Sequence, residues 1–140
     1  MNHNEIEEKL GVVFTDKDLL ERSFIHRSYI NENKGKALEN NERLEFLGDA
    51  VLELIISSHL YSQYRNKSEG ELTAIRSAIV RTESLALQSR ELDLGEHLLM
   101  SKGEEDSGGK DKDFLLANLF EAVLGAIYID KGYQEAEVFI

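Results

Sequence analysis

The stretch that decides the fold is NERLEFLGDAVLE, residues 41–53, which combines a strongly apolar run with four acidic residues and a glycine. Its apolar residues recur at intervals of three and four, the period of a helix with one buried face. At about 100° of rotation per residue, Glu42, Glu45 and Asp49 share an arc of about 60°. The stretch therefore predicts a helix with an acidic stripe along one side.

The same helical geometry places the core-facing side of this helix opposite the acids. That side carries five aliphatic residues: Leu44, Leu47, Val51, Leu54 and Ile55. Phe46 falls beside the carboxylates instead, about 40° from Glu42. We therefore expect Phe46 to face an open cleft or a second subunit, where an exposed aromatic side chain is a natural anchor.

A glycine inside the helix, Gly48, points to a close neighbour. Glycine in a helix interior costs roughly 1 kcal/mol relative to alanine, so its presence suggests that another segment packs too closely for a side chain. The best candidate is FLLANLFEAVLGAIYI, residues 114–129, which is apolar on nearly every side and also contains a glycine, Gly125. We expect the two helices to cross at their small residues.

Such a crossing would gather polar side chains from both helices. Asn118 and Glu121 are three positions apart and share the side of the second glycine, so they would meet Glu45 and Asp49. Buried carboxylates do not stay ionised unaided, because desolvation and repulsion both raise the pKa. A divalent cation removes that problem, and oxygen ligands favour Mg²⁺ or Mn²⁺ over zinc or copper. Hard ions on carboxylates are typical of phosphodiester hydrolysis.

The rest of the chain is predicted as helical, since proline is absent and the apolar spacing recurs. The expected helices cover residues 4–10, 15–25, 41–64, 68–81, 82–90, 114–129 and 133–140. Thr15 and Ser68 begin capping patterns. Residues 26–29 are expected to form a turn, and residues 31–40 and 101–113 surface loops. The fold class is therefore all-α, a single compact helical domain that covers residues 1–140.

Composition limits the possible function classes. Sixteen Lys and Arg against 27 Asp and Glu give a net charge of -11, which argues against non-specific attraction to nucleic acid. The absence of cysteine excludes disulfides and thiolate metal sites and fits a reducing compartment. The sequence also lacks a membrane-length apolar stretch and the features of a signal peptide, so we expect a cytoplasmic protein without a membrane partner.

With these residues in view, NERLEFLGDAVLEL resembles the signature motif of the ribonuclease III family, the double-stranded-RNA endonucleases. Three further segments are similar to the family's N-terminal region, its middle and its second catalytic helix: FIHRSYINEN, GELTAIRSAIVRTESLALQSRELDLGEHLLMSKGEEDSGGKDKD and LLANLFEAVLGAIYIDKGY. Together the four segments cover nearly the whole chain.

The resemblance implies an all-α domain that forms a homodimer over double-stranded RNA, with one site in each subunit. Each site would use Mg²⁺, or Mn²⁺ as a substitute, and no small-molecule cofactor. Hydrolysis would leave 5′-phosphate and 3′-hydroxyl ends with short 3′ overhangs, in ribosomal and messenger RNA processing. The implied catalytic residues are Glu42, Glu45, Asp49 and Glu121, and the implied metal ligands are Glu45, Asp49, Asn118 and Glu121. Phe46 matches the aromatic residue that inserts into the partner subunit.

Two features depart from the family pattern. Asn118 stands where the family usually has aspartate, and an amide oxygen coordinates metal without contributing negative charge, so affinity for Mg²⁺ should fall. Bacterial members usually carry a basic double-stranded-RNA-binding domain after this one, and residues 1–140 contain none. We therefore expect weak, salt-sensitive binding of the substrate.

Other interpretations stay open. A single buried glutamate more often forms a structural ion pair, here with Arg43, although four polar groups on two helices favour a metal site. A dimer that binds double-stranded RNA but cuts it weakly or not at all is the main alternative function. A di-iron carboxylate bundle is a third, but the Glu-x-x-His pair of that class is missing.

Basic residues and histidines give weaker signals. Four cations are candidate RNA contacts, although a residue of this kind is more often an ordinary solvated charge: Arg27, Arg65, Lys67 and Arg76. His26 is interpreted as a capping or packing histidine rather than a catalytic base.

Overall fold

The computed structural model describes residues 1–33 and 39–140, and in these residues it contains helices and no β-strand. The α-helices are α1 (His3–Leu10), α2 (Lys17–Ser23), α3 (Arg27–Glu32), α4 (Glu42–Gln63), α5 (Glu69–Val80), α6 (Thr82–Glu91), α7 (Lys102–Asp106), α8 (Asp113–Lys131) and α9 (Tyr133–Phe139). Two short 3₁₀ helices are η1 (Leu94–His97) and η2 (Gly109–Asp111). The predicted all-α fold class is confirmed.

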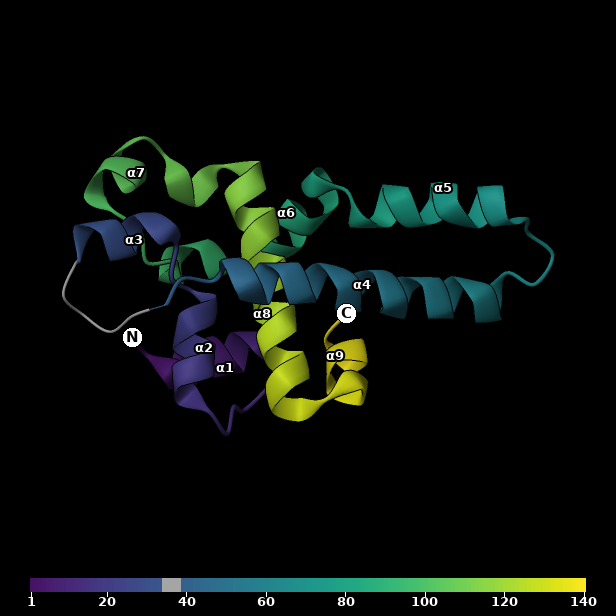
Figure 1. Ribbon diagram of the computed structural model, residues 1–140, viewed down its shortest axis with the longest axis horizontal. Coiled ribbons are helices and arrows are strands. Elements are labelled where there is room, and N and C mark those ends of the chain that lie inside the picture. Colours follow the sequence, from purple (N-terminus) through teal and green to yellow (C-terminus); the bar gives the residue numbers. More distant parts are fainter. Residues whose placement is uncertain (34–38) are drawn as a thin grey trace.

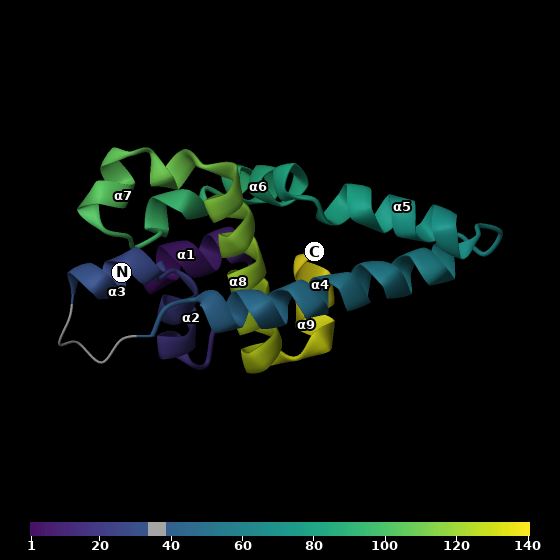
Figure 2. The same cartoon turned by 45° about the horizontal axis from the view of Figure 1, so that its top comes forward.

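Helix α8 forms the centre of the molecule. It is buried from Leu115 to Ile127 except at Asn118, because its sequence is apolar on nearly every side. Figures 1 and 2 show α4 crossing α8, with α2 near the C-terminal end of α8 and α6 beside its other half. Helix α9 folds back against α8, where Phe139 stacks on Phe120 with ring centroids 5.4 Å apart.

The second half of α4 and all of α5 form an arm that extends away from this body (Figures 1 and 2). Ser68 and Glu71 form the predicted capping box at the start of α5, with Ser68 accepting a bond from the Glu71 amide. No residue of α5 is buried, although Leu72 and Ile75 are partly buried against the core. The α5 part of the arm is thus only partly covered by the rest of the molecule.

The core face of α4 differs from the prediction at Leu54. Its side chain is 59% exposed, whereas Leu52 and Ile56 are buried. The prediction from the sequence pattern treated one side of the helix as packed against the core along its whole length. Because α4 leaves the body after its crossing with α8, the side of the arm that carries Leu54 has no described element to cover it.

Short elements near the N-terminus also differ from the prediction. The cap of α2 is Asp16 rather than Thr15, with the Asp16 carboxylate accepting a bond from the Leu19 amide at 3.1 Å. The Thr15 amide donates instead to the Asp130 carboxylate at 2.8 Å. The predicted turn at residues 26–29 is wrong, because residues from Arg27 onward form α3.

The two predicted loops are shorter than expected. Helix α3 includes Asn31 and Glu32, and residues 34–38 of the first loop lie outside the described residues. The expectation of a loop over residues 101–113 is wrong, since it contains α7 and η2. Ser101 caps α7, and Lys112 pairs with Glu104 at 3.1 Å, so local polar contacts order this segment. None of the helices in the described ranges has both the length and the hydropathy needed to cross a membrane.

Candidate metal centre

Two glycines allow α4 and α8 to touch through their backbones. A Cβ atom added to Gly48 would lie 1.7 Å from the carbonyl oxygen of Glu121, and one added to Gly125 would lie 2.3 Å from that of Leu44. Real side chains never approach a backbone so closely. The predicted crossing at small residues is therefore present, and it fixes Glu121 opposite the acidic side of α4.

The crossing creates an open hollow with acidic walls, referred to below as the acidic hollow. Its lining consists of Glu42, Glu45, Phe46, Asp49 and Glu121. The three carboxylates that the sequence predicted on one side of α4 thus meet the glutamate of α8. Phe46 stands at the same hollow with 82% of its surface exposed, as expected for an aromatic residue outside the core.

The acidic hollow is electrostatically uncompensated. Burial, the Asp49 hydrogen bond and nearby negative charges raise the pKa of Glu121 to about 8. Burial and the charges of Glu42 and Asp49 also raise the pKa of Glu45. Across residues 1–33 and 39–140, no Lys, Arg or His forms an ion pair with these four carboxylates, and Arg43 is among the cations without such a contact. The alternative of a structural ion pair has no support here.

Asn118 lies one helical turn before Glu121 and is half-buried. It lines a second, smaller hollow, which we call the side hollow. Its lining consists of His26, Arg27, Asn41, Glu42, Glu45, Leu98, Phe114, Leu115 and Asn118. Glu42 and Glu45 line both hollows, so Glu45 shares one hollow with Asn118 and the other with Glu121.

The donor set of the acidic hollow fits a hard divalent ion. Glu45, Asp49 and Glu121 offer carboxylate oxygens, and Asn118 adds a neutral amide oxygen nearby. These oxygens are not yet gathered at ligand spacing. In the part of the chain described, the one set of three Asp, Glu or His groups with ligand atoms within 4.8 Å is Glu5, Glu96 and His97. Binding at the acidic hollow would therefore draw its side chains inward.

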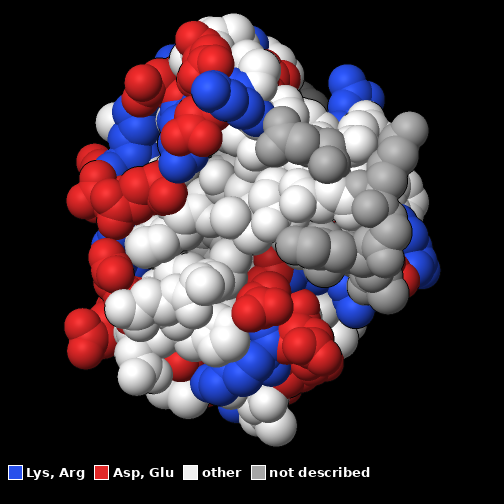
Figure 3. Space-filling model, turned by 90° about the vertical axis from the view of Figure 1, so that its left-hand side faces the viewer, with Lys and Arg blue, Asp and Glu red and all other residues white. Residues whose placement is uncertain are grey.

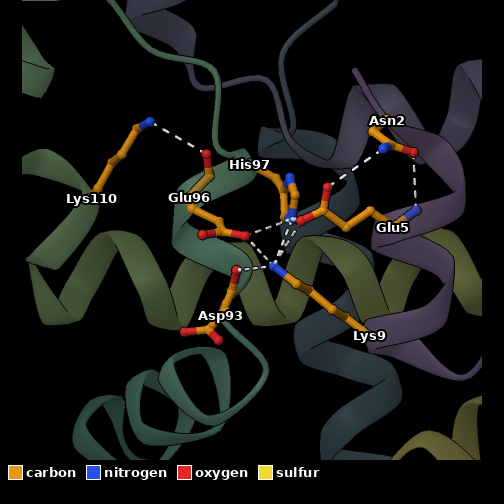
Figure 4. Close-up of polar contacts among 7 residues, drawn as sticks. All are labelled: Asn2, Glu5, Lys9, Asp93, Glu96, His97 and Lys110. Atoms are coloured by element: carbon orange, nitrogen blue, oxygen red, sulfur yellow. Dashed lines mark hydrogen bonds and ion pairs between the residues drawn. The ribbon is translucent and has the colours of Figure 1, made fainter.

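The cluster at Glu5, Glu96 and His97 already contains a cation. Figure 4 shows Lys9 reaching into it from α1. The Lys9 ammonium contacts Glu96 directly, lies 2.9 Å from His97 Nε2 and is 3.7 Å from Glu5. Lys9 supplies the charge that an ion would bring, so this cluster fastens α1 to η1 and is not a second metal centre.

The predicted RNA contacts are scattered. Arg27, at the start of α3, lines the side hollow, and no ion pair to it is present among the described residues. Arg65 and Lys67 lie in the turn between α4 and α5, at the far end of the arm (Figure 1). Lys67 pairs with Glu71 at 3.8 Å, and Arg76 donates to Ser57 at 2.8 Å.

The charge distribution on the surface agrees with the scattered positions of the predicted RNA contacts. Figure 3 views the end of the molecule that carries α3 and α7, and its acidic and basic side chains are interspersed around an uncharged area. The described residues on that face do not form a single continuous basic patch. Whatever phosphate group binds there must meet local cations or a metal ion rather than a broad positive field.

His26 has the capping role that the sequence predicted. Its Nδ1 accepts a hydrogen bond from the Ser28 amide at 3.2 Å, which caps α3, and also lies 2.7 Å from the Ser28 hydroxyl. Burial lowers the pKa of His26, which favours the neutral form of the ring. The sequence did not predict that His26 and Phe114 would line a hollow beside the acids, because neither belongs to the two motif helices' polar faces.

Comparison with known proteins places the fold and the site in context. Residues 16–140 match the family model described as ribonuclease-III-like. The chain is 52% identical over 140 residues to Ribonuclease 3 of Lactococcus lactis subsp. cremoris, covering 97% of this chain and 61% of that protein. It is 51% identical over 136 residues to Ribonuclease 3 of Enterococcus faecalis, with 97% and 59% covered. The chain thus spans about three fifths of the length of these relatives.

A solved structure agrees with the sequence comparisons. The nuclease domain of ribonuclease III from Campylobacter jejuni, whose structure concerns flexibility in a region involved in dimer formation, superposes with a TM-score of 0.91 at 39% identity. The match covers 99% of this chain and 92% of that one. The resemblance inferred from the motifs is confirmed, and the chain belongs to the ribonuclease-III-like family.

Proposed function

We propose that this chain is the nuclease domain of a metal-dependent endoribonuclease that cleaves double-stranded RNA. The observation that carries the proposal is the acidic hollow, where Glu45, Asp49 and Glu121 meet from two crossing helices with no ion-pairing cation in the described residues. The relatives named Ribonuclease 3 support the reaction class. The products would carry 5′-phosphate and 3′-hydroxyl ends with short 3′ overhangs.

In this mechanism, Glu45, Asp49 and Glu121 would hold Mg²⁺, and the Asn118 amide would be a weaker ligand. The ion, when bound, supplies a hydroxide nucleophile near neutral pH and stabilises the leaving oxygen. The raised pKa of Glu121 means that its carboxyl would hold a proton near neutral pH before the ion binds and would release it when the site is loaded. Glu42 stands at the rim of both hollows and adds negative charge at the edge of the site.

A cleavage assay tests this function and separates it from the main alternative. Duplex RNA incubated with the protein across a Mg²⁺ or Mn²⁺ series should be cut, and Asp49→Asn should abolish cutting while leaving the fold intact by circular dichroism. Binding of the duplex without cleavage at any metal concentration would favour the alternative, a double-stranded-RNA-binding dimer that has lost or weakened its activity.

Asn118 should set the metal requirement. Restoring aspartate with Asn118→Asp adds a charged ligand beside Glu45, so the Mg²⁺ concentration for half-maximal cleavage should fall by about tenfold. Titration of cleavage rate against Mg²⁺ measures the shift, with Asn31→Asp, on the exposed surface of α3, as a matched charge control. An unchanged or higher requirement in Asn118→Asp would show that Asn118 does not contribute to the site.

Phe46 should anchor a homodimer. Its ring is 82% exposed at the rim of the acidic hollow, and Leu54 and Tyr61 are exposed further along α4. Phe46→Glu places a charge in the proposed interface, so the dissociation constant of the dimer should increase by about 10²-fold. This size follows from the roughly 2 to 4 kcal/mol that an interface anchor contributes. Sedimentation equilibrium of the variant measures this, with Val13→Glu, an exposed residue before α2, as the control. Equal dissociation constants would argue against Phe46 as an anchor.

Arg27 is the strongest of the candidate RNA contacts, because it adjoins the acidic residues and forms no described ion pair. Arg27→Gln should weaken duplex binding and reduce the slope of log affinity against log salt by about one. Fluorescence anisotropy from low to moderate salt measures the slope. We expect smaller changes at Lys67 and Arg76, which have intramolecular partners, and for Arg65 at the end of the arm.

The biological setting follows from the family and stays a prediction. Residues 1–140 would act as one nuclease domain, in the cytoplasm, on precursors of ribosomal RNA and on messenger RNA. Cell fractionation and sequencing of RNA 5′ ends in a strain that lacks the protein would test both statements.

A further inference from the structure

The lining of the side hollow combines two kinds of charged and polar residue. Glu42 and Glu45 are shared with the acidic hollow, whereas His26 and Arg27 can donate hydrogen bonds. Its volume is about 170 Å³, well below the roughly 300 to 1,000 Å³ of ordinary small-molecule pockets. The side hollow therefore suits a short part of an extended chain rather than a whole small molecule.

The hydrogen-bonding state of His26 follows from its cap. A backbone N–H can only donate, so the bond from the Ser28 amide requires an unprotonated Nδ1. A neutral imidazole carries its proton on the other nitrogen, so Nε2 is a donor. Nε2 has no hydrogen-bond partner among the described residues, and no side-chain nitrogen or oxygen there is both buried and without a partner. Nε2–H is thus accessible.

An N–H donor of this kind binds an electron-rich oxygen atom as its hydrogen-bond acceptor. Arg27 adds a guanidinium beside it, and the partners of these two donors in RNA are phosphate and ribose oxygens. Glu45, which lines the side hollow together with His26 and Arg27, belongs to the proposed cleavage site. A strand that places one phosphate in the acidic hollow would carry the adjoining sugar and phosphate past the side hollow.

We propose that the side hollow binds the sugar–phosphate unit next to the scissile phosphate, with His26 Nε2–H and Arg27 as its donors. His26 acts here as a positioning residue that caps α3 with one nitrogen and holds the RNA strand with the other. The proposal rests on the proposed function, because the acidic hollow defines the scissile position. It assigns to His26 a role that capping alone does not require.

Two substitutions separate the two roles of His26. His26→Asn retains an oxygen that caps α3 but has no group at the position of Nε2, whereas His26→Gln places an amide N–H near that position and lacks the short capping side chain. We expect His26→Asn to retain the wild-type Tm and to weaken duplex binding by about tenfold or more, as for a lost hydrogen bond to a charged group. His26→Gln should lower Tm and bind within about twofold of wild type.

Anisotropy of a fluorescein-labelled RNA duplex, with EDTA present so that no cleavage occurs, measures binding independently of catalysis. His59→Asn, at an exposed position on α4, is the matched control and should bind as wild type does. In Mg²⁺, His26→Asn should raise KM with little change in kcat. Equal affinity of His26→Asn and wild type would overturn the subsite. Failure of the unmodified protein to cut RNA would refute the nuclease instead, while the binding comparison still decides the subsite.

Discussion

Gly48→Ala is expected to unfold most of the protein under conditions in which the wild type is folded. The added Cβ would lie 1.7 Å from the Glu121 carbonyl oxygen and 3.1 Å from the Gly125 amide nitrogen. Neither atom belongs to a flexible side chain, so α4 and α8 would have to separate along their buried contact. We expect a loss of roughly 3 kcal/mol or more in the free energy of unfolding, at the upper end of overpacking effects.

Urea denaturation followed by circular dichroism measures this loss. Gly70→Ala provides the matched control, because Gly70 lies in α5 with only the Ser68 hydroxyl at 4.0 Å from its added Cβ. That control should change stability by no more than about 1 kcal/mol, and in the stabilising direction. A Gly48→Ala protein as stable as the wild type would mean that the helices do not cross as described.

Glu121→Gln is expected to separate activity from stability. Cleavage should fall by roughly 10³-fold, comparable to the loss of a main stabilising group at a reaction centre, because one carboxylate of the site is gone. The metal-free protein should nevertheless become more stable at neutral and higher pH. The amide keeps the shape of the side chain while removing a buried acid that Asp49 and Glu45 repel.

The sign of the pH dependence follows from the two states of Glu121. Its pKa is about 8 in the folded protein and near the ordinary value of 4.5 when unfolded. Between these values the folded state binds more protons, so the wild-type free energy of unfolding decreases as pH rises, by at most about 1.4 kcal/mol per pH unit. Glu121→Gln lacks this term, so its advantage over wild type should grow from pH 5 to pH 8 and then level off.

Thermal unfolding at pH 5, 6.5 and 8 in the presence of EDTA tests this dependence. Glu8→Gln is a suitable control, since Glu8 is an exposed acid on α1 and is not among the charges that raise the pKa of Glu121. A difference between Glu121→Gln and wild type that stays constant with pH would mean that Glu121 is ionised throughout. Addition of Mg²⁺ at pH 8 should narrow the difference, because a bound cation stabilises the ionised wild-type cluster.

The central part of the fold could be predicted because its determinants are local in the sequence. The spacing of Glu42, Glu45 and Asp49 fixes their common side of α4, and the period of the apolar residues fixes the helix itself. Gly48 and Gly125 indicate the crossing, since each would be unfavourable in a helix without a close neighbour. Together these signals predict, from the sequence alone, that the acids of α4 meet Glu121.

The features that the sequence patterns did not predict depend on contacts between segments far apart in the sequence. Leu54 matches a core position by its spacing, but it is exposed because α4 extends beyond the body. The Asp130 carboxylate accepts a hydrogen bond from the Thr15 amide, 115 residues away in the sequence, and Asp16 caps α2 in place of Thr15. Residues 101–113 are polar and contain glycine, yet the pair of Lys112 and Glu104 orders them.

The side hollow shows the same limit for function. It forms where the starts of α3, α4 and α8 meet, so its lining combines residues that no single motif contains. His26 could be identified as a cap from its neighbours in sequence. Its second nitrogen comes to line the hollow only when α3, α4 and α8 meet, and that arrangement is a tertiary one.

Crystals of the protein soaked in Mn²⁺ and measured for anomalous scattering test the central claim most directly. The convergence of Glu45, Asp49 and Glu121 predicts an anomalous peak in the acidic hollow, with oxygens of those three side chains about 2.2 Å from it, as is usual for hard divalent ions. The same peak should be absent from Glu121→Gln crystals, because that variant lacks one of the three carboxylate ligands. A peak at Glu5, Glu96 and His97 instead, or none at any Mn²⁺ concentration, would contradict the metal centre and the nuclease built on it.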